Sequence, residues 1–191
     1  MTATPKAAGV VVVTCMDARI RVDRFGLRAT QVNVLRNAGG RATDDVVRSL
    51  VVAWRILDVQ EFLVVHHTDC RMMATTDERI RADVTAATGV DASRLEFLTF
   101  TNNRQSVEED VERIMRSPYL AGAVPTSGYI WDLRAQKLQP VVVDPRARAA
   151  AAATTTTTPN TPGTTAGTRS PTATVPSGGI WTRGVRKGPG S

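Results

Sequence analysis

The sequence has few of the features that mark a secreted or membrane-bound protein. Its 191 residues include only two cysteines, Cys15 and Cys70, which is too few for a disulfide framework. No apolar run approaches the roughly 20 residues of a membrane span, and no secretory signal is visible. These absences predict a cytoplasmic protein without a membrane partner. The two cysteines then bind a metal, act in catalysis or are buried as small apolar groups.

Acidic residues are absent from the chain after Asp144. Residues 147–191 carry five of the six net positive charges, so residues 1–146 are nearly neutral. We therefore expect no nucleic-acid binding by the folded part. The Ala-, Thr-, Pro- and Gly-rich composition after Arg146 predicts a disordered tail, because it offers too little apolar surface to offset the entropy of ordering. The sequence thus predicts a catalytic domain over 1–146 and a disordered tail over 147–191.

Short apolar runs alternate with amphipathic segments within residues 9–146. The runs predict strands at 9–14, 31–35, 61–66 and 95–100, and a hairpin that turns at 134–136. Helical periodicity predicts helices starting at Thr43, at Thr75 and shortly before Val107. The alternation indicates an α/β fold. We expect an open, mainly parallel sheet with helices on both faces and a closing antiparallel edge strand.

Cysteine and histidine follow two of the expected strands. Cys15 comes directly after the first apolar run, and His67 and Cys70 follow the third. The carboxyl ends of neighbouring parallel strands meet at one edge of a sheet, so these side chains are expected to converge. Thiolate and imidazole are ligands that Zn²⁺ prefers, and three protein ligands leave a fourth position for water. The pattern predicts a catalytic zinc site.

Asp17 and Arg19 follow Cys15 at alternate positions. In extended backbone such residues face the same side, so Asp17 is expected beside the open metal position. Arg19 then pairs with Asp17 and keeps it from displacing the water, from which Asp17 can accept a hydrogen bond. His66 is expected on the opposite face of its strand, as a hydrogen-bonded core residue.

Four motifs in this chain resemble those of the β-class carbonic anhydrases. They are C-M-D-A-R at 15–19, R-N-A-G at 36–39, T-D-D at 43–45 and H-H-T-D-C at 66–70. The resemblance covers nearly all of residues 9–146. It implies one zinc ion per chain, held by Cys15, His67 and Cys70. It also implies an Asp17–Arg19 catalytic dyad, with Asp17 as a fourth ligand in a closed state, and a pocket-lining loop formed by Asn37, Ala38, Gly39 and Gly40.

The resemblance further implies an activity and an assembly. The activity is zinc-dependent reversible hydration of carbon dioxide to bicarbonate and a proton by zinc-bound hydroxide, in a homodimer or higher homo-oligomer. Two thiolates cancel the charge of the metal, so the rate is expected to rise into the alkaline range. Two alternatives remain open on the same fold: hydrolysis of carbonyl sulfide or carbon disulfide, and an inactive zinc-binding homologue. One departure from the family pattern is Arg71, which stands where glycine is usual.

A different class of enzyme shares part of the first motif. Cys15 and Arg21 have the C-x5-R spacing of cysteine phosphatases, whose loop binds phosphate through backbone N–H groups. Here the loop contains Asp17, whose charge repels a phosphate dianion, and it has no glycine. This alternative also leaves His67 and Cys70 without a role. We therefore expect Arg21 to be a surface residue.

Overall fold

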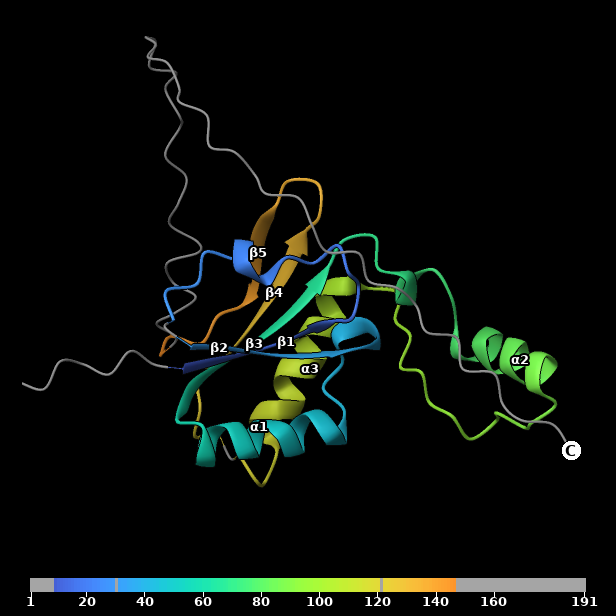
Figure 1. Ribbon diagram of the computed structural model, residues 1–191, viewed down its shortest axis with the longest axis horizontal. Helices are drawn as coiled ribbons and strands as arrows, with labels where there is room; N and C mark the ends of the chain where they lie inside the picture. The colour runs from blue at the N-terminus through green and yellow to red at the C-terminus, as the bar shows by residue number, and fades with distance from the viewer. Residues whose placement is uncertain (1–8, 30, 121, 147–191) are drawn as a thin grey trace, which may run out of the picture. The chain divides into compact units, whose positions relative to one another are not determined.

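A computed structural model describes residues 9–29, 31–120 and 122–146 of the chain (Figure 1). Five strands form one sheet in the order β2-β1-β3-β4-β5. Their bounds are Gly9–Cys15 (β1), Gln31–Asn37 (β2), Val59–His67 (β3), Thr126–Asp132 (β4) and Lys137–Val142 (β5). All neighbours are parallel except β4 and β5, which are antiparallel. The predicted α/β sheet with a closing antiparallel strand is confirmed, whereas the predicted tail lies outside the described residues.

Strand β1 lies between β2 and β3, and every one of its residues is buried. Its continuous valine run suits this position, because a strand covered on both faces has no polar side to present. The parallel register pairs Thr14 with Val65, so β1 and β3 end at the same edge. This pairing brings Cys15 and His67, the last residues of the two strands, to that edge.

The two faces of the sheet are covered unequally. Helices α1 (Asp44–Ile56) and α3 (Asn103–Arg116) pack on one face, against side chains that include Val11, Phe62 and Val64 (Figure 1). Among the described residues, the other face carries the short helix η1 (Val22–Arg24) with its flanking loop, and the short helix η3 (Arg71–Met73) packs at its edge. There the Phe25 ring lies 4.8 Å from the ring of Trp131. Helices were expected on both faces of the sheet. The structure has long helices on one face and single-turn helices on the other.

Side-chain caps start the three longer helices. The Thr43 hydroxyl accepts the Val46 N–H at the start of α1, as its sequence predicts. Helix α2 (Asp77–Thr88) is capped by Thr76, so the predicted cap at Thr75 is wrong by one residue. The Thr76 hydroxyl reaches the N–H of Arg79. Gly89 ends α2 in the left-handed conformation, as expected from its position.

The predicted strand at 95–100 is wrong. Residues 95–99 lie in an arm (residues 74–99) that contains α2 and projects from the sheet (Figure 1). The Asp77 carboxylate accepts the N–H groups of Phe97 and Thr99, which a neighbouring strand would otherwise engage. Leu98 between them has φ of +57°, which is incompatible with an extended strand. A tertiary contact thus overrides the local preference of LEFLTF for a strand.

Candidate metal centre

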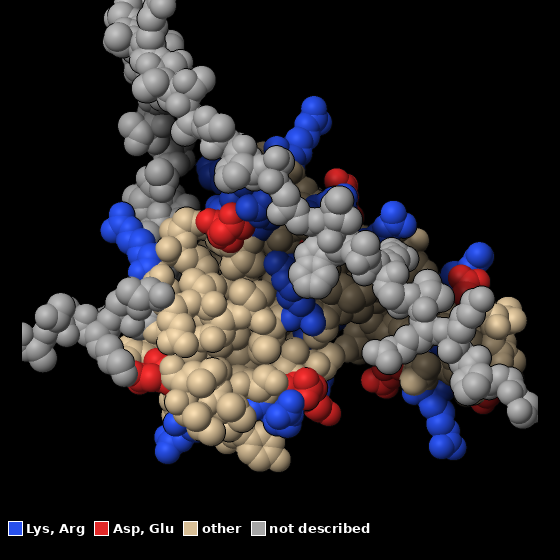
Figure 2. Space-filling view, viewed as in Figure 1, with Lys and Arg blue, Asp and Glu red and all other residues tan. Residues whose placement is uncertain are grey.

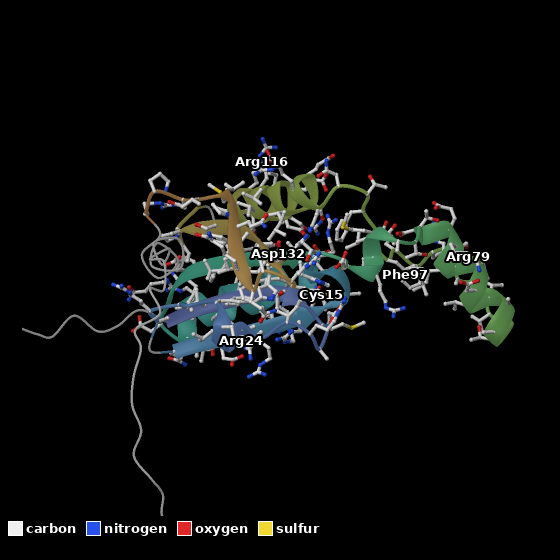
Figure 3. The ribbon with its side chains drawn as sticks, turned by 90° about the horizontal axis from the view of Figure 1, so that it is seen from above. Cys15, Arg24, Arg79, Phe97, Arg116 and Asp132 are labelled. Carbon is white, nitrogen blue, oxygen red and sulfur yellow. The ribbon has the colours of Figure 1, made fainter. Side chains whose placement is uncertain are left out.

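Cys15, His67 and Cys70 converge at the carboxyl edge of the sheet. Their candidate ligand atoms all lie within 4.8 Å of one another, and all three residues are buried. Cys15 ends β1, His67 ends β3, and Cys70 follows in the turn that leads to the short helix η3 (Arg71–Met73). Figure 3 shows Cys15 where the sheet meets the arm. The geometry brings together the three residues that the sequence selects as zinc ligands.

The imidazole of His67 has one ring nitrogen engaged and one free. Its Nδ1 lies 2.9 Å from the carbonyl oxygen of Thr68, so Nδ1 carries the proton and donates it. That tautomer leaves a lone pair on Nε2, which is buried and has no hydrogen-bond partner among the described residues. A buried nitrogen lone pair without a partner is costly unless a ligand occupies it. The Nε2 atom is therefore presented as a metal ligand.

The pKa values of the two thiols are shifted in opposite directions. A hydrogen bond from the Cys70 thiol lowers the pKa of Cys15 to about 4, although burial opposes this shift. The same hydrogen bond, together with burial, raises the pKa of Cys70. The metal-free pair thus holds one thiolate and one thiol near neutral pH. Backbone N–H groups of Asp17 and Gly39 also donate to the Cys15 sulfur.

The loop of residues 37–40 lies beneath Cys15. Gly40 has φ of +75°, and a Cβ atom there would come within 2.9 Å of the Cys15 nitrogen, so only glycine fits. The Asn37 side chain donates to the carbonyl of Arg41 and closes the loop. This loop supports Cys15 through backbone contacts. Its expected role in lining a substrate pocket stays a prediction.

Asp17 stands beside the three candidate ligands and is held by Arg19. Its Oδ2 atom lies 4.0 Å from Nε2 of His67 and 2.6 Å from Nη2 of Arg19. Nε of Arg19 also donates to both carboxylate oxygens, and the Arg19 N–H donates to Oδ1. These hydrogen bonds lower the pKa of Asp17 to about 2. The carboxylate is thus ionised and fixed in orientation near the candidate ligands.

A hollow of about 580 Å³ opens at this point, lined by Met16, Asp17, Arg19, Asp69 and Arg71. Asp69 contributes its carbonyl oxygen as a second acceptor for Nη2 of Arg19. Arg71 is exposed on the rim. Arg21 lies outside the hollow, where its exposed guanidinium pairs with Asp23, as expected for a surface residue.

The donor set fits zinc. Two sulfurs and one imidazole nitrogen are the borderline-soft ligands of tetrahedral zinc, and three protein donors leave one position for a small molecule. The Nε2 atom of His67 has no partner in the part of the chain that the structure describes, which gives an independent sign that a ligand belongs there. With Asp17 beside it, the centre can activate a water molecule for attack on a small electrophile.

A buried polar network lies on the opposite face of β3. His66 Nε2 is 3.1 Å from Oδ2 of Asp110, so His66 is the hydrogen-bonded core histidine that we predicted. Asp110 also pairs with Nε of Arg41 and accepts the N–H of Ala42. Sequence reasoning missed Asp110, because a single acid within an amphipathic helix gives no sign of a partner so distant in the chain.

A second missed residue holds the backbone of a candidate ligand. The side chain of Asn103, the first residue of α3, donates to the carbonyl of His67. It thereby ties the end of β3 to the start of α3. The sequence offers no signal for this contact, because asparagine at a helix start is common for capping alone.

Comparisons with known proteins agree with this geometry. The carbonic anhydrase family model matches residues 10–130. The chain is 32% identical over 138 residues to β-carbonic anhydrase 1 of Mycobacterium tuberculosis, covering 72% of this chain and 84% of that protein. It is 31% identical over 149 residues to a carbon disulfide hydrolase of Acidithiobacillus thiooxidans, covering 68% and 75%. The crystal structure of a carbonic anhydrase from Streptococcus mutans is similar with a TM-score of 0.66 at 39% identity, covering 69% and 80%.

Proposed function

Because the chain belongs to the β-carbonic anhydrase family, we propose that it is a lyase catalysing the zinc-dependent, reversible hydration of carbon dioxide to bicarbonate and a proton. The observation that carries this proposal is the cluster of Cys15, His67 and Cys70 with the ionised Asp17 beside it. Such a centre suits a small, neutral electrophile that needs no cationic anchor. Zinc, when bound by these three residues, supplies a Lewis acid that lowers the pKa of a water ligand.

The residues around the centre each have a defined task. Asp17 accepts a hydrogen bond from the attacking water and so directs its lone pair toward the substrate carbon. Arg19 engages both oxygens of Asp17, which restrains the carboxylate from moving onto the metal. The N–H of Gly39 donates to the sulfur of Cys15 and so fixes it. The hydrogen bond from Nδ1 of His67 to the carbonyl of Thr68 fixes the orientation of the imidazole.

A metal assay combined with stopped-flow measurement of carbon dioxide hydration tests the proposal. We expect about one zinc ion per chain, as one three-ligand site provides, and activity that is lost with a chelator and restored by zinc. Protein that binds no zinc would refute the whole assignment. Bound zinc without carbon dioxide hydration would favour either another substrate or the inactive homologue.

Carbon disulfide or carbonyl sulfide hydrolysis is the second candidate function. It is favoured by the 31% identity to the carbon disulfide hydrolase of Acidithiobacillus thiooxidans. Carbon dioxide, carbonyl sulfide and carbon disulfide are linear triatomic molecules with an electrophilic carbon, so one centre could serve all three. Parallel assays of carbon dioxide hydration and hydrogen sulfide release on one zinc-loaded preparation distinguish them.

We also propose that the protein forms a homodimer through strand β2. Within the described residues β2 pairs on one side only, and its Val32 and Val34 side chains are 38% and 39% exposed. Exposed Val52 and Leu57 extend this apolar surface onto and just beyond α1, and Figure 2 shows few charges over this region. An open, apolar edge strand is suited to pairing with a second copy.

Fewer observations bear on the cellular location of the protein and on its contacts with membranes and nucleic acids. No helix in the part of the chain that the structure describes has the length and hydropathy to cross a membrane. The cytoplasmic location and the lack of a nucleic-acid partner stay predictions from composition.

A further inference from the structure

The guanidinium of Arg36 joins both ends of the loop that carries Asp17 and Arg19. Arg36 lies near the end of β2, opposite Thr14 of β1. Its Nη1 atom donates to the carbonyl of Cys15 at 2.9 Å, and its Nη2 atom donates to the carbonyl of Ile20 at 3.1 Å. The residues between these two carbonyls, 16–20, are called the dyad loop below.

Few other contacts hold the dyad loop. Met16 and the Arg19 side chain are 66% and 53% exposed, so neither is fixed by packing, whereas Ile20 is buried. Within the loop, the N–H of Ile20 donates to the carbonyl of Asp17, and the Arg19 N–H donates to its carboxylate. These short-range bonds define the shape of the turn. Its placement against the sheet depends on the Met16 N–H bond to the carbonyl of Asn37, on the Arg19 bond to the carbonyl of Asp69, on burial of Ile20 and on the fork of Arg36. The Asp17 N–H bond to the Cys15 sulfur adds a contact at the start of the loop.

We propose that Arg36 is a positioning residue, which holds the dyad loop so that the Asp17 carboxylate stays beside the candidate metal centre. This inference rests on the proposed function for its effect on the rate. Both Nη atoms of Arg36 donate to backbone carbonyls at the two ends of the dyad loop. We therefore assign Arg36 an indirect effect on the reaction, exerted through the position of Asp17 and not through contact with the substrate. The same fork holds the backbone of Cys15, so it couples one candidate ligand to the dyad.

The chemistry of the contact explains why arginine suits this position. A guanidinium presents parallel N–H donors at a fixed separation, which can span two carbonyls at once. A lysine ammonium is a single point of charge and cannot reproduce the planar fork. Displacement of a catalytic group by about 1 Å can cost about 100-fold in rate, so a modest loosening of the loop is measurable.

The test compares R36A and R36K with R21Q. The R21Q variant removes the same charge from a nearby exposed arginine that pairs only with Asp23 among the described residues. We expect R36A to lower kcat/KM per bound zinc by about 10- to 100-fold, R36K to be intermediate, and R21Q to be unchanged.

Added guanidinium ion at millimolar concentration should restore part of the activity of R36A and none of R36K. A merely structural role would lower the melting temperature or zinc content without this rescue.

A second measurement does not depend on the reaction. Amide hydrogen exchange of the metal-free protein should quicken at Arg19 and Ile20 in R36A, while exchange within β1 and β3 stays unchanged. Wild-type protein that binds zinc without hydrating carbon dioxide would refute the proposed function, and the exchange result would still decide whether Arg36 holds the loop. Unchanged exchange in R36A, or wild-type kcat/KM per bound zinc in that variant, would overturn the inference.

Discussion

Arg19 engages the carboxylate of Asp17 through three side-chain hydrogen bonds, the shortest being 2.6 Å between Nη2 and Oδ2. The same Asp17 oxygen lies 4.0 Å from Nε2 of His67. A residue two positions along the chain therefore orients an acid beside the candidate metal centre.

Asn at position 17 should lower kcat/KM for carbon dioxide hydration by about 100-fold, because a neutral amide is a poor acceptor for the proton of the attacking water. The hydrogen bonds from Arg19 hold the pKa of Asp17 at about 2, so the carboxylate is ionised at all pH values above about 4. The loss in D17N should therefore be constant between pH 6 and pH 9. Stopped-flow assays measure it, with D23N as the matched surface control. Full activity in D17N would remove Asp17 from the mechanism.

Zinc binding to the metal-free protein near pH 7 should release about one proton, not two. Cys15 is already a thiolate, because the hydrogen bond from Cys70 lowers its pKa to about 4, whereas the pKa of Cys70 is raised. The proton that leaves comes from Cys70. Calorimetric titration in buffers of different ionisation enthalpy counts released protons. Release of two protons would contradict the assignment of Cys15 as a thiolate in the metal-free protein.

The arm should loosen when Asp77 is replaced by asparagine. Burial raises the pKa of Asp77, but hydrogen bonds from Thr99 and the backbone of Phe97 outweigh it and lower the pKa to about 2. A depressed pKa contributes stability above pH 4 that is lost as the pH falls toward 2. We expect D77N to weaken the arm by about 2 kcal/mol at pH 7, and the difference from wild type to shrink below pH 4.

Amide exchange of residues 95–100 as a function of pH measures this loss. The control is D83N, which removes an exposed carboxylate of the same helix that pairs with exposed Arg79. Equal exchange rates in D77N and D83N at pH 7 would contradict the assigned role of Asp77.

Alanine in place of Asp110 should destabilise the fold by about 3 kcal/mol. The substitution removes the carboxylate that lies beside His66, pairs with Arg41 and accepts the N–H of Ala42, and it leaves the mostly buried Arg41 guanidinium without a buried counter-charge. Urea unfolding gives the free-energy difference. E109A is the control, since Glu109 meets Arg41 at the surface. Similar stability in D110A and E109A would show that the buried network contributes little.

Lysine in place of Val34 should dissociate the proposed dimer. Val34 is exposed on the open strand β2, and a charge there disfavours pairing of two edges. V90K, at an exposed position just after α2, is the matched control. Sedimentation equilibrium should show dimers for wild type and V90K and monomers for V34K. A V34K protein that stays dimeric would place the interface elsewhere.

The sequence by itself indicated the five strands of the sheet, together with one segment that is not a strand, and it indicated that three candidate ligands meet at one edge. A run of valines is suited only to a buried central strand, and parallel strands end at a common edge, so Cys15, His67 and Cys70 could be assigned to one place. The alternation of Asp17 with Arg19 predicted their pairing, because that contact is local.

Only the tertiary structure decided the contacts between distant segments. Residues 95–100 have a strand-like sequence, yet the Asp77 carboxylate takes their N–H groups across 20 or more positions. Arg36 joins the two ends of the dyad loop, and Asp110 meets His66, through the same kind of long-range contact. Periodicity and propensity describe a segment with its neighbours in the chain. Which donor meets which acceptor depends on how the packed elements are placed in space.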